Sequence, residues 1–250
     1  RIKECLKEGM ERQSRSIGDA YYYLEEIKED LKKEFQIILD EEELLKYLEE
    51  LKKSGDVFFE NDAIYLKKYY DIELDIAHIL RRMSRYPKKS IKGLKNKLTY
   101  LEDMLEVKYN KDQETAILTA LENPISIISG GPGTGKTTIV NAITKLFIEV
   151  YKLSPIEVTS QIALLAPTGR AAKKLSLSTH LPASTIHRFL KWNKDTNNFQ
   201  INEYNKNYQK LIIVDETSMI DEYLFVSLLK GIPESSQIVF VGDTFQLPSV

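Results

Sequence analysis

Cysteine is almost absent from this sequence, in which Cys5 is the single one among 250 residues. One cysteine cannot form a disulfide framework or a cysteine-based zinc site within the chain, and it fits the reducing cytoplasm. No apolar run approaches the roughly 20 residues of a membrane span, and no signal peptide is recognisable. The sequence therefore predicts a cytoplasmic protein with no membrane partner. Because it begins with Arg1 rather than Met, we expect it to start inside a longer protein.

The chain also lacks a strong excess of either charge. It carries 35 Lys and Arg against 37 Asp and Glu, for a formal net charge of −2. The distribution is uneven, because residues 25–56 hold twelve acidic and six basic side chains, whereas residues 81–97 hold eight basic and none acidic. Residues 170–194 again hold six Lys or Arg and no Asp or Glu. Charge runs are usually solvated faces, but two purely basic windows favour contact with a nucleic-acid backbone.

Residues 1–85 are predicted to form a small helical module with a winged-helix-like pattern. Apolar residues at helical spacing predict a helix over 20–35, and a capping-box pair, Asp40 and Glu43, predicts a second that ends at Gly55. A hairpin is expected over 56–67, followed by a third helix over 71–85. A module of this kind binds duplex DNA or packs against protein, and the sequence leaves both open.

The remaining residues divide into a basic linker, 86–108, and a region of alternating strands and helices, 109–250. Pro87 interrupts the preceding helix, and the linker is either solvated or close to nucleic acid. The alternation predicts an α/β fold with a parallel sheet. Near-continuous apolar runs, typical of strands covered on both faces, predict its strands: 125–129, 162–166, 211–214 and 238–241.

A glycine-rich segment joins the first of these strands to a helix that starts near Lys136. Its spacing, from Gly130 through Gly135 to Lys136 and Thr137, fits the phosphate-binding loop pattern. Glycines allow backbone N–H groups to converge on an anion, and the helix N-terminus adds partial positive charge. We expect Lys136 to reach the β- and γ-phosphates and Thr137 to bind Mg²⁺. A glycine-rich turn without a ligand is the structural alternative.

Polar residues after two later strands complete the predicted chemistry. Asp215 and Glu216 follow the strand 211–214; Asp215 is expected to hold Mg²⁺ and Glu216 to deprotonate the attacking water. Gln246 follows the strand 238–241, where it could donate to a γ-phosphate oxygen and accept from a water. A solvated strand end and a plain turn residue are the respective alternatives.

Further candidates carry weaker signals. Gln113 has the donor–acceptor pair that matches an adenine edge, although an exposed helix glutamine has the same pattern. Thr168 opens a helix where a phosphate can bind. His187 is expected to hydrogen-bond or stack on a base rather than bind a metal, with a structural histidine as the alternative. Residues 189–204, which include Trp192, predict an exposed hairpin that either wedges a duplex or forms a surface loop.

Taken together, five segments resemble the N-terminal motor half of superfamily 1B DNA helicases of the RecD/TraA family. The resemblance covers residues 109–250, and residues 20–82 weakly resemble the helical and winged region that precedes the motor in RecD-like proteins. The segments are Gly-Gly-Pro-Gly-Thr-Gly-Lys-Thr (130–137, motif I), Ala-Pro-Thr-Gly-Arg-Ala-Ala (166–172, motif Ia), Thr-Ile-His-Arg (185–188, motif Ib), Val-Asp-Glu-Thr-Ser-Met (214–219, motif II) and Gly-Asp-Thr-Phe-Gln-Leu-Pro-Ser-Val (242–250, motif III).

The resemblance implies a RecA-like domain over 109–250 and an ATP-dependent 5′→3′ DNA helicase of recombination and repair. Its cofactors would be ATP and Mg²⁺, and its partners single-stranded DNA, junctions of single- and double-stranded DNA, and subunits of a nuclease–helicase complex. The implied site residues are Lys136, Glu216 and Gln246 for catalysis; Gln113, Gly131, Gly133, Thr134, Gly135, Lys136, Thr137 and Thr138 for nucleotide; Thr137 and Asp215 for metal; and Thr168, Arg170, His187 and Arg188 for DNA.

Two departures and one missing part qualify the implied function. Thr217 stands where motif II usually has Ala, and Phe245 is more like the related PIF family. The sequence stops at Val250, directly after motif III, so a second RecA-like domain with its arginine finger is expected to be absent. We therefore expect this piece to bind Mg·ATP weakly and not to unwind DNA. The alternatives are a PIF-like helicase, a nucleotide-dependent DNA-binding switch that does not translocate, and a phosphate-loop kinase.

Overall fold

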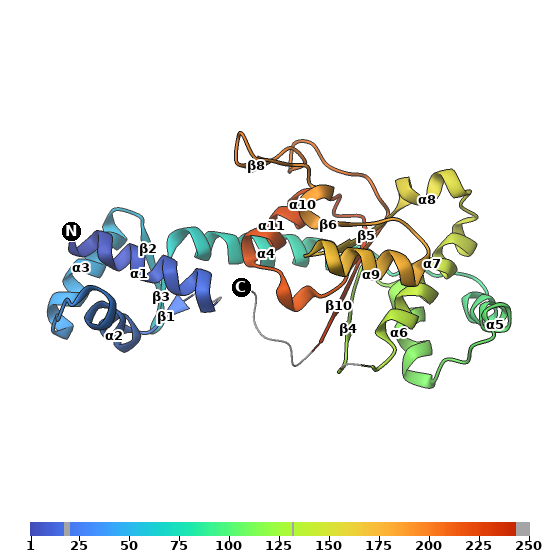
Figure 1. Ribbon diagram of the computed structural model, residues 1–250, viewed down its shortest axis with the longest axis horizontal. Coiled ribbons are helices and arrows are strands. Elements are labelled where there is room, and N and C mark those ends of the chain that lie inside the picture. The colour runs from blue at the N-terminus through green and yellow to red at the C-terminus, as the bar shows by residue number, and fades with distance from the viewer. Residues whose placement is uncertain (18–20, 132, 244–250) are drawn as a thin grey trace. The chain divides into compact units, whose positions relative to one another are not determined.

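The computed structural model describes residues 1–17, 21–131 and 133–243. These residues form two compact units, which are described separately below and whose elements are labelled in Figure 1. The first unit contains residues 1–77 together with 221–223, and the second contains 78–220 and 224–243 among the described residues. Helix α4, Lys67–Ser84, contributes residues to both units.

The first unit packs helices against a small antiparallel sheet with the strand order β1-β3-β2. Its core consists of buried Leu, Ile, Met and Val side chains together with Tyr22, whose hydroxyl donates to the carbonyl oxygen of Met10 at 2.6 Å. In chain order the elements before α4 are α1 (Ile2–Ile17), β1 (Tyr21–Tyr22), α2 (Leu24–Phe35), α3 (Glu41–Lys53), β2 (Val57–Glu60) and β3 (Ala63–Leu66).

Several local predictions for this unit are confirmed. Strands β2 and β3 form the expected hairpin, and the backbone N–H of Glu43 donates to Asp40 Oδ1 at 2.8 Å in the predicted capping box. The predicted start of the first helix at residue 20 is wrong. Tyr21 and Tyr22 instead pair with β3 as the short strand β1, so α2 begins at Leu24.

The second unit is built around a parallel sheet with the strand order β4-β10-β9-β5-β6, and this confirms the predicted α/β class. All four predicted strands are present. The elements after α4 are α5 (Leu94–Leu105), α6 (Lys111–Glu122), β4 (Ile125–Ser129), α7 (Lys136–Tyr151), α8 (Pro155–Gln161), β5 (Ile162–Ala166), α9 (Gly169–Thr179), β6 (Ala183–Thr185), α10 (Ile186–Phe189), β7 (Trp192–Asn193), β8 (Asn198–Phe199), β9 (Leu211–Val214), the 3-10 helix η1 (Thr217–Met219), α11 (Glu222–Lys230) and β10 (Gln237–Gly242).

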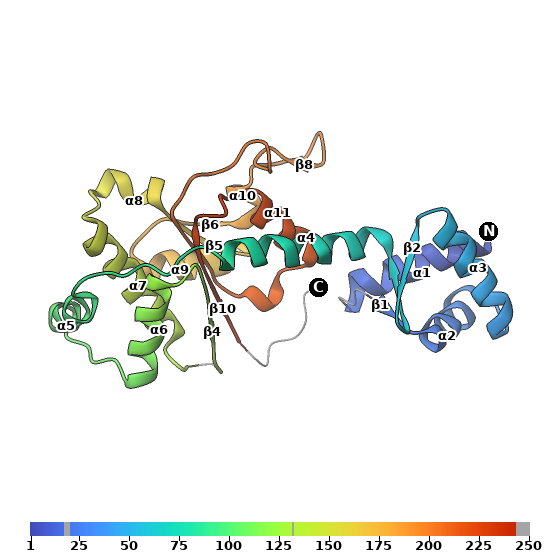
Figure 2. The ribbon, with the colours of Figure 1, turned by 180° about the vertical axis from the view of Figure 1, so that it is seen from behind.

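Helices cover both faces of this sheet, as Figure 2 shows from behind. One face packs against α5, α6, α7 and α9 in a single large core, while Phe225 of α11 packs against Phe240 on the other face. The expected linker 86–108 differs from an irregular connector, because it contains α5. Leu94, Leu98 and Leu101 of α5 are buried in the core at a spacing of three to four residues. Their burial stabilises a helix in a segment that is otherwise rich in lysine.

The register of the sheet brings separate polar segments to one edge. Parallel pairing aligns Val214 with Phe240 and Val241 with Ile128, so strands β4, β10 and β9 end side by side. The loops after these strands therefore lie together, and ligands in open parallel sheets bind at such carboxyl ends.

Candidate functional site

The loop between β4 and α7 adopts the backbone that its glycines make possible. Gly133 and Gly135 have φ values of 77° and 82°, a left-handed conformation that costs other residues strain. A Cβ added at Gly135 would lie 2.6 Å from Gln113 Nε2, so a side chain here would have to displace the end of the Gln113 side chain. Thr134 Oγ1 donates to the carbonyl oxygen of Gly131 at 2.8 Å, and Pro132 lies outside the described residues.

Lys136 is held by the loop that precedes it. Its Nζ donates to the carbonyl oxygens of Gly130 and Gly131 at 2.9 and 2.7 Å and forms an ion pair with Asp243. Both charged side chains are mostly buried, with exposed fractions of 16% for Lys136 and 15% for Asp243. The ammonium group is therefore already surrounded by oxygen acceptors, the environment that a phosphate would also supply.

Asp215 and Glu216 lie at the end of β9. Asp215 Oδ1 accepts from the backbone N–H of Glu216 at 2.9 Å, and Glu216 has the left-handed φ of 52°. The Thr217 hydroxyl donates to the Val241 carbonyl oxygen at 2.9 Å. Thr217 thus ties the end of β9 to the end of β10, which gives a structural role to the residue that departs from the helicase pattern.

Burial raises the pKa of the Asp215 carboxyl above its usual value, and the nearby Asp243 acts in the same direction. The Glu216 N–H and the ammonium groups of Lys174 and Lys136 partly oppose this shift of the pKa. A buried carboxylate with a raised pKa is one whose ionised form lacks sufficient compensating charge. A divalent cation would supply that charge.

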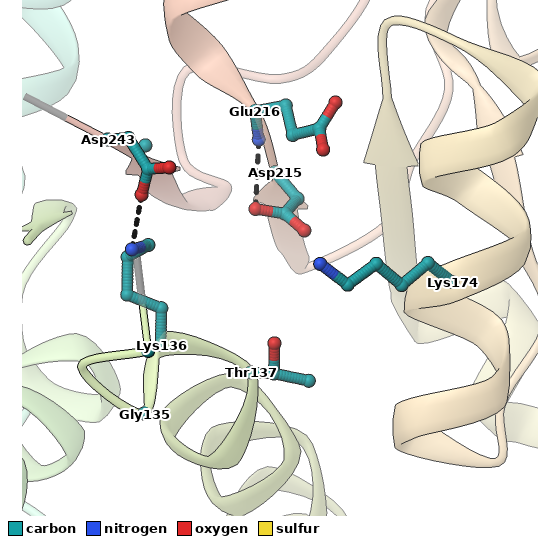
Figure 3. A pocket seen from close by; sticks show the side chains of 9 residues that line it. Gly135, Lys136, Thr137, Lys174, Asp215, Glu216 and Asp243 are labelled. Atoms are coloured by element: carbon teal, nitrogen blue, oxygen red, sulfur yellow. Dashed lines mark hydrogen bonds and ion pairs between the residues drawn. The ribbon is translucent and has the colours of Figure 1, made fainter. Parts of the chain in front are cut away.

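These groups line one cavity of about 390 Å³ within the second unit. Figure 3 shows Lys136 below Asp243, with Asp215 and Glu216 beside them and Thr137 facing Asp215 from the start of α7. The lining residues are Gly133, Gly135, Lys136, Thr137, Lys174, Asp215, Glu216, Gly242 and Asp243. Hydroxyl and carboxylate oxygens are ligands that suit Mg²⁺, which usually keeps several waters and binds substrate phosphates as well. The residues present therefore fit a magnesium ion shared with a phosphate group.

Other expected nucleotide contacts lie outside this lining. Gln113 lies beside Gly135, but its Oε1 accepts from the backbone N–H of Asn110 at 3.1 Å in a capping box at the start of α6. Its amide oxygen is therefore engaged within the chain, and reading an adenine edge would require this bond to be exchanged. The cavity lining also leaves out Gly131, Thr134 and Thr138.

The expected DNA contacts follow two neighbouring strands, β5 and β6. Ala166 pairs with Thr185, so the segments after these residues leave the sheet at the same edge. Arg170, His187 and Arg188 are exposed, whereas the Thr168 hydroxyl accepts from the Ala171 N–H at 3.2 Å and caps α9. The structure therefore places these four residues near one another but does not bring them into the cavity.

The predicted hairpin is present as β7 and β8, but its aromatic side chains do not all project outward. Trp192 and Phe199 pack together with their ring centroids 4.7 Å apart, and Phe199 is buried. The His187 ring lies beside both rings, with its centroid 6.1 Å from that of Trp192 and 5.7 Å from that of Phe199. These ring contacts join the hairpin to α10, and His187 as a residue is exposed.

Three cavity residues, Lys174, Gly242 and Asp243, were not among the candidate site residues of the sequence, although Gly242 and Asp243 begin the segment that resembles motif III. Asp243 follows β10 as Asp215 follows β9, so the meeting of parallel strand ends was the signal that could have identified it. Lys174 lies four residues after Arg170 on α9 and had only its basic neighbourhood as a signal. Gln246, expected at the γ-phosphate, lies outside the described residues, as does the rest of 244–250.

Neither a membrane span nor a clustered metal site was found among the described residues. None of the described helices combines the length and apolar character needed to cross a bilayer. Within residues 1–17, 21–131 and 133–243, no three His, Cys, Asp or Glu side chains are grouped so that they could hold a metal.

Comparison with known proteins gives a consistent family. The family model described as "AAA domain" matches residues 113–250. The RecBCD enzyme subunit RecD of Haemophilus influenzae is 35% identical over 159 residues, which is 55% of this chain and 24% of that protein. The ATP-dependent RecD2 DNA helicase of Deinococcus radiodurans is 34% identical over 165 residues, 66% of this chain and 19% of that protein.

A third relative extends further toward the N-terminus. The RecBCD enzyme subunit RecD of Buchnera aphidicola is 32% identical over 210 residues, 77% of this chain and 34% of that protein. Among solved structures, Pif1 helicase from Candida albicans aligns at 22% identity with a TM-score of 0.43, covering 58% of this chain and 34% of that chain. The chain thus spans between a fifth and a third of the length of these three curated relatives.

Proposed function

We propose that the full-length protein is an ATP-dependent DNA helicase of recombination and repair. The chain belongs to the family described as "AAA domain" and is similar to RecD-like superfamily 1 helicases. In this proposal residues 109–250 are the first RecA-like motor domain. The observation that carries it is the convergence of Lys136, Thr137, Asp215 and Glu216 on one cavity at the carboxyl edge of the parallel sheet.

The proposed ligand is ATP with Mg²⁺. The phosphates would lie against the N-terminus of α7, where Lys136 exchanges its loop carbonyls and Asp243 for phosphate oxygens. Thr137 and Asp215 would hold the metal, which when bound neutralises the developing charge on the transferred phosphoryl group. Glu216 is assigned to orient the attacking water and take its proton. Gln246 keeps its assignment as a γ-phosphate contact, together with the remaining sequence-derived nucleotide contacts: Gln113, Gly131, Gly133, Thr134, Gly135 and Thr138.

The proposed DNA track lies where β5 and β6 end. Exposed Arg170 and Arg188 would contact phosphates, and the ring of the exposed His187 would stack on a base. Because the two segments leave neighbouring parallel strands, a single strand could contact both. We assign single-stranded DNA and its junctions with duplex as substrates, with 5′→3′ polarity implied by the RecD-like relationship.

The domain division is proposed on similar grounds: an N-terminal winged-helix-like module over 1–85, a connecting segment over 86–108 and the motor domain. The hairpin β2–β3 packed with three helices supports the first assignment. Two relatives are named as subunits of the RecBCD enzyme. Association with nuclease or helicase subunits in the cytoplasm is therefore part of the proposal.

The test is ATP hydrolysis by the full-length protein with and without single-stranded DNA. Lys136→Ala is expected to abolish hydrolysis and to leave DNA binding largely intact, because the residues of the proposed DNA track follow β5 and β6 and do not line the cavity that contains Lys136. Lys145→Ala, on the same helix α7, is the matched control and is expected to retain hydrolysis. Unchanged turnover in Lys136→Ala would remove the cavity from the proposed chemistry, and hydrolysis without stimulation by DNA would contradict a motor function.

A further inference from the structure

A second lysine enters the proposed nucleotide cavity from the side opposite Lys136. Lys174 is on α9, and its ammonium group extends toward the Asp215 carboxylate in Figure 3. Helix α9 follows β5, whereas the loop that carries Lys136 follows β4, so two different strands supply the two cations. Lys174 is exposed and lies within the electrostatic range of Asp215.

The charges in the cavity leave a role for this second cation. Its lining holds three carboxylates, from Asp215, Glu216 and Asp243, against the ammonium groups of Lys136 and Lys174. Lys136 is engaged by Asp243 and by two loop carbonyls. Lys174 extends toward Asp215, and the residues that the structure describes do not surround it with a comparable set of acceptors. A triphosphate carries one more charged group than a diphosphate, and an exposed lysine at the cavity wall can contact that group.

The direction of the bound nucleotide follows from the same residues. Gln113 lies next to Gly135, at the loop side of the cavity, and it is the residue expected to meet the base. In Figure 3, Gly135 lies below Lys136, whereas Glu216 lies above Lys136 and Lys174 enters from the far side of the cavity. A nucleotide with its base toward Gln113 would therefore direct its last phosphate toward Glu216 and Lys174.

We propose that Lys174 binds the terminal phosphate of a nucleoside triphosphate and so makes the site prefer triphosphate over diphosphate. This inference rests on the proposed nucleotide-binding function and assigns a specificity-determining role to a residue outside the phosphate-loop pattern. Lys136 would contact phosphates common to both nucleotides, and Lys174 would contact the group that hydrolysis removes.

The experiment measures equilibrium binding of two fluorescent nucleotides, a non-hydrolysable ATP analogue and ADP, each with Mg²⁺, to the 250-residue chain. Lys174→Met removes the charge and keeps the side-chain length, and Lys174→Arg keeps the charge. Lys173→Met is the matched control, because Lys173 is exposed on the same helix and does not line the cavity. Lys136→Ala tests the underlying nucleotide site.

Loss of a charge-assisted contact is expected to weaken binding of the ATP analogue by about tenfold or more in Lys174→Met. ADP affinity and the Mg²⁺ concentration required for binding should stay as in Lys173→Met, and Lys174→Arg should restore the preference for triphosphate. If Lys136→Ala loses binding while Lys174→Met equals Lys173→Met, this inference is overturned and the proposed function stands. An equal loss for both nucleotides also overturns it, and wild-type protein that binds neither nucleotide overturns both.

Discussion

The ion pair between Lys136 and Asp243 should couple the phosphate loop to the end of β10 in the folding stability of the second unit. Lys136→Met removes a cation that contacts Asp243 and two loop carbonyls, and it leaves three carboxylates around one cavity. Breaking a fully buried pair in this way costs about 3–5 kcal/mol. Exposed fractions of 16% and 15%, in a cavity open to solvent, reduce the expected loss to about 2 kcal/mol.

Asp243→Asn should cost less, because an amide oxygen still accepts from Lys136 and one negative charge leaves an acidic cavity. The double variant should therefore be more stable than the sum of the single losses, with a coupling energy of about 1–2 kcal/mol. The chain offers a control in the exposed pair Lys97–Glu149, whose side chains are 34% and 55% exposed. Its coupling energy should be about 0.5 kcal/mol or less.

The coupling energy of this double-mutant cycle can be measured by urea unfolding followed by tryptophan fluorescence. Trp192 is the single tryptophan of the sequence and belongs to the second unit, so its signal reports the unit that contains the ion pair. Free energies of unfolding are compared between variants whose unfolding free energy depends on urea concentration with the same slope. A coupling energy no larger than that of the Lys97–Glu149 control would refute the argument that the loop lysine is anchored by Asp243 in the ligand-free chain.

Three further outcomes are expected. Burial raises the pKa of Asp215 above 3.8, so the free energy of unfolding should fall as pH rises from about 4 through the raised pKa. Asp215→Asn should remove the contribution of Asp215 to this decline, stabilise the ligand-free chain near pH 7 and abolish Mg²⁺-dependent nucleotide binding. Tyr22→Phe removes a bond from a fully buried hydroxyl and should cost the first unit about 1–2 kcal/mol, measured by circular dichroism during urea unfolding, with exposed Tyr100→Phe unchanged. Arg170→Ala should lower the slope of log affinity against log salt for oligothymidylate binding by about 1, and an unchanged slope would exclude it from the track.

Strong local signals explain which parts of the fold could be predicted. The four central strands are near-continuous apolar runs because helices cover both faces of the sheet, and the hairpin β2–β3 is marked by its turn residues. The strand order and the long-range pairing of β1 with β3 depend on contacts far apart in sequence. Helix α5 was missed because its lysines dominated the composition, although its leucines already had helical spacing.

The residues of the candidate site also divide into those that the sequence predicts and those that only the folded structure reveals. A motif fixes the spacing of Lys136 and Thr137 in the sequence, and the apolar strand before Asp215 fixes where its carboxylate emerges. Lys174 and Asp243 reach the cavity only because α9 and β10 are folded against those elements. Convergence of side chains in this way is a property of the tertiary structure. The residues of the proposed DNA track lie outside the cavity, and they too are brought together by the pairing of β5 with β6.

A crystal structure of the chain with Mg²⁺ and a non-hydrolysable ATP analogue would show whether the cavity at the end of β4, β9 and β10 binds nucleotide. We expect one metal ion with the Thr137 hydroxyl among its ligands at about 2.1 Å. The Asp215 carboxylate should bind it directly or through water, and the β- and γ-phosphates should lie against Lys136. A nucleotide bound elsewhere, or a metal ion out of reach of both Thr137 and Asp215, would show that this cavity is not the site of Mg·ATP binding.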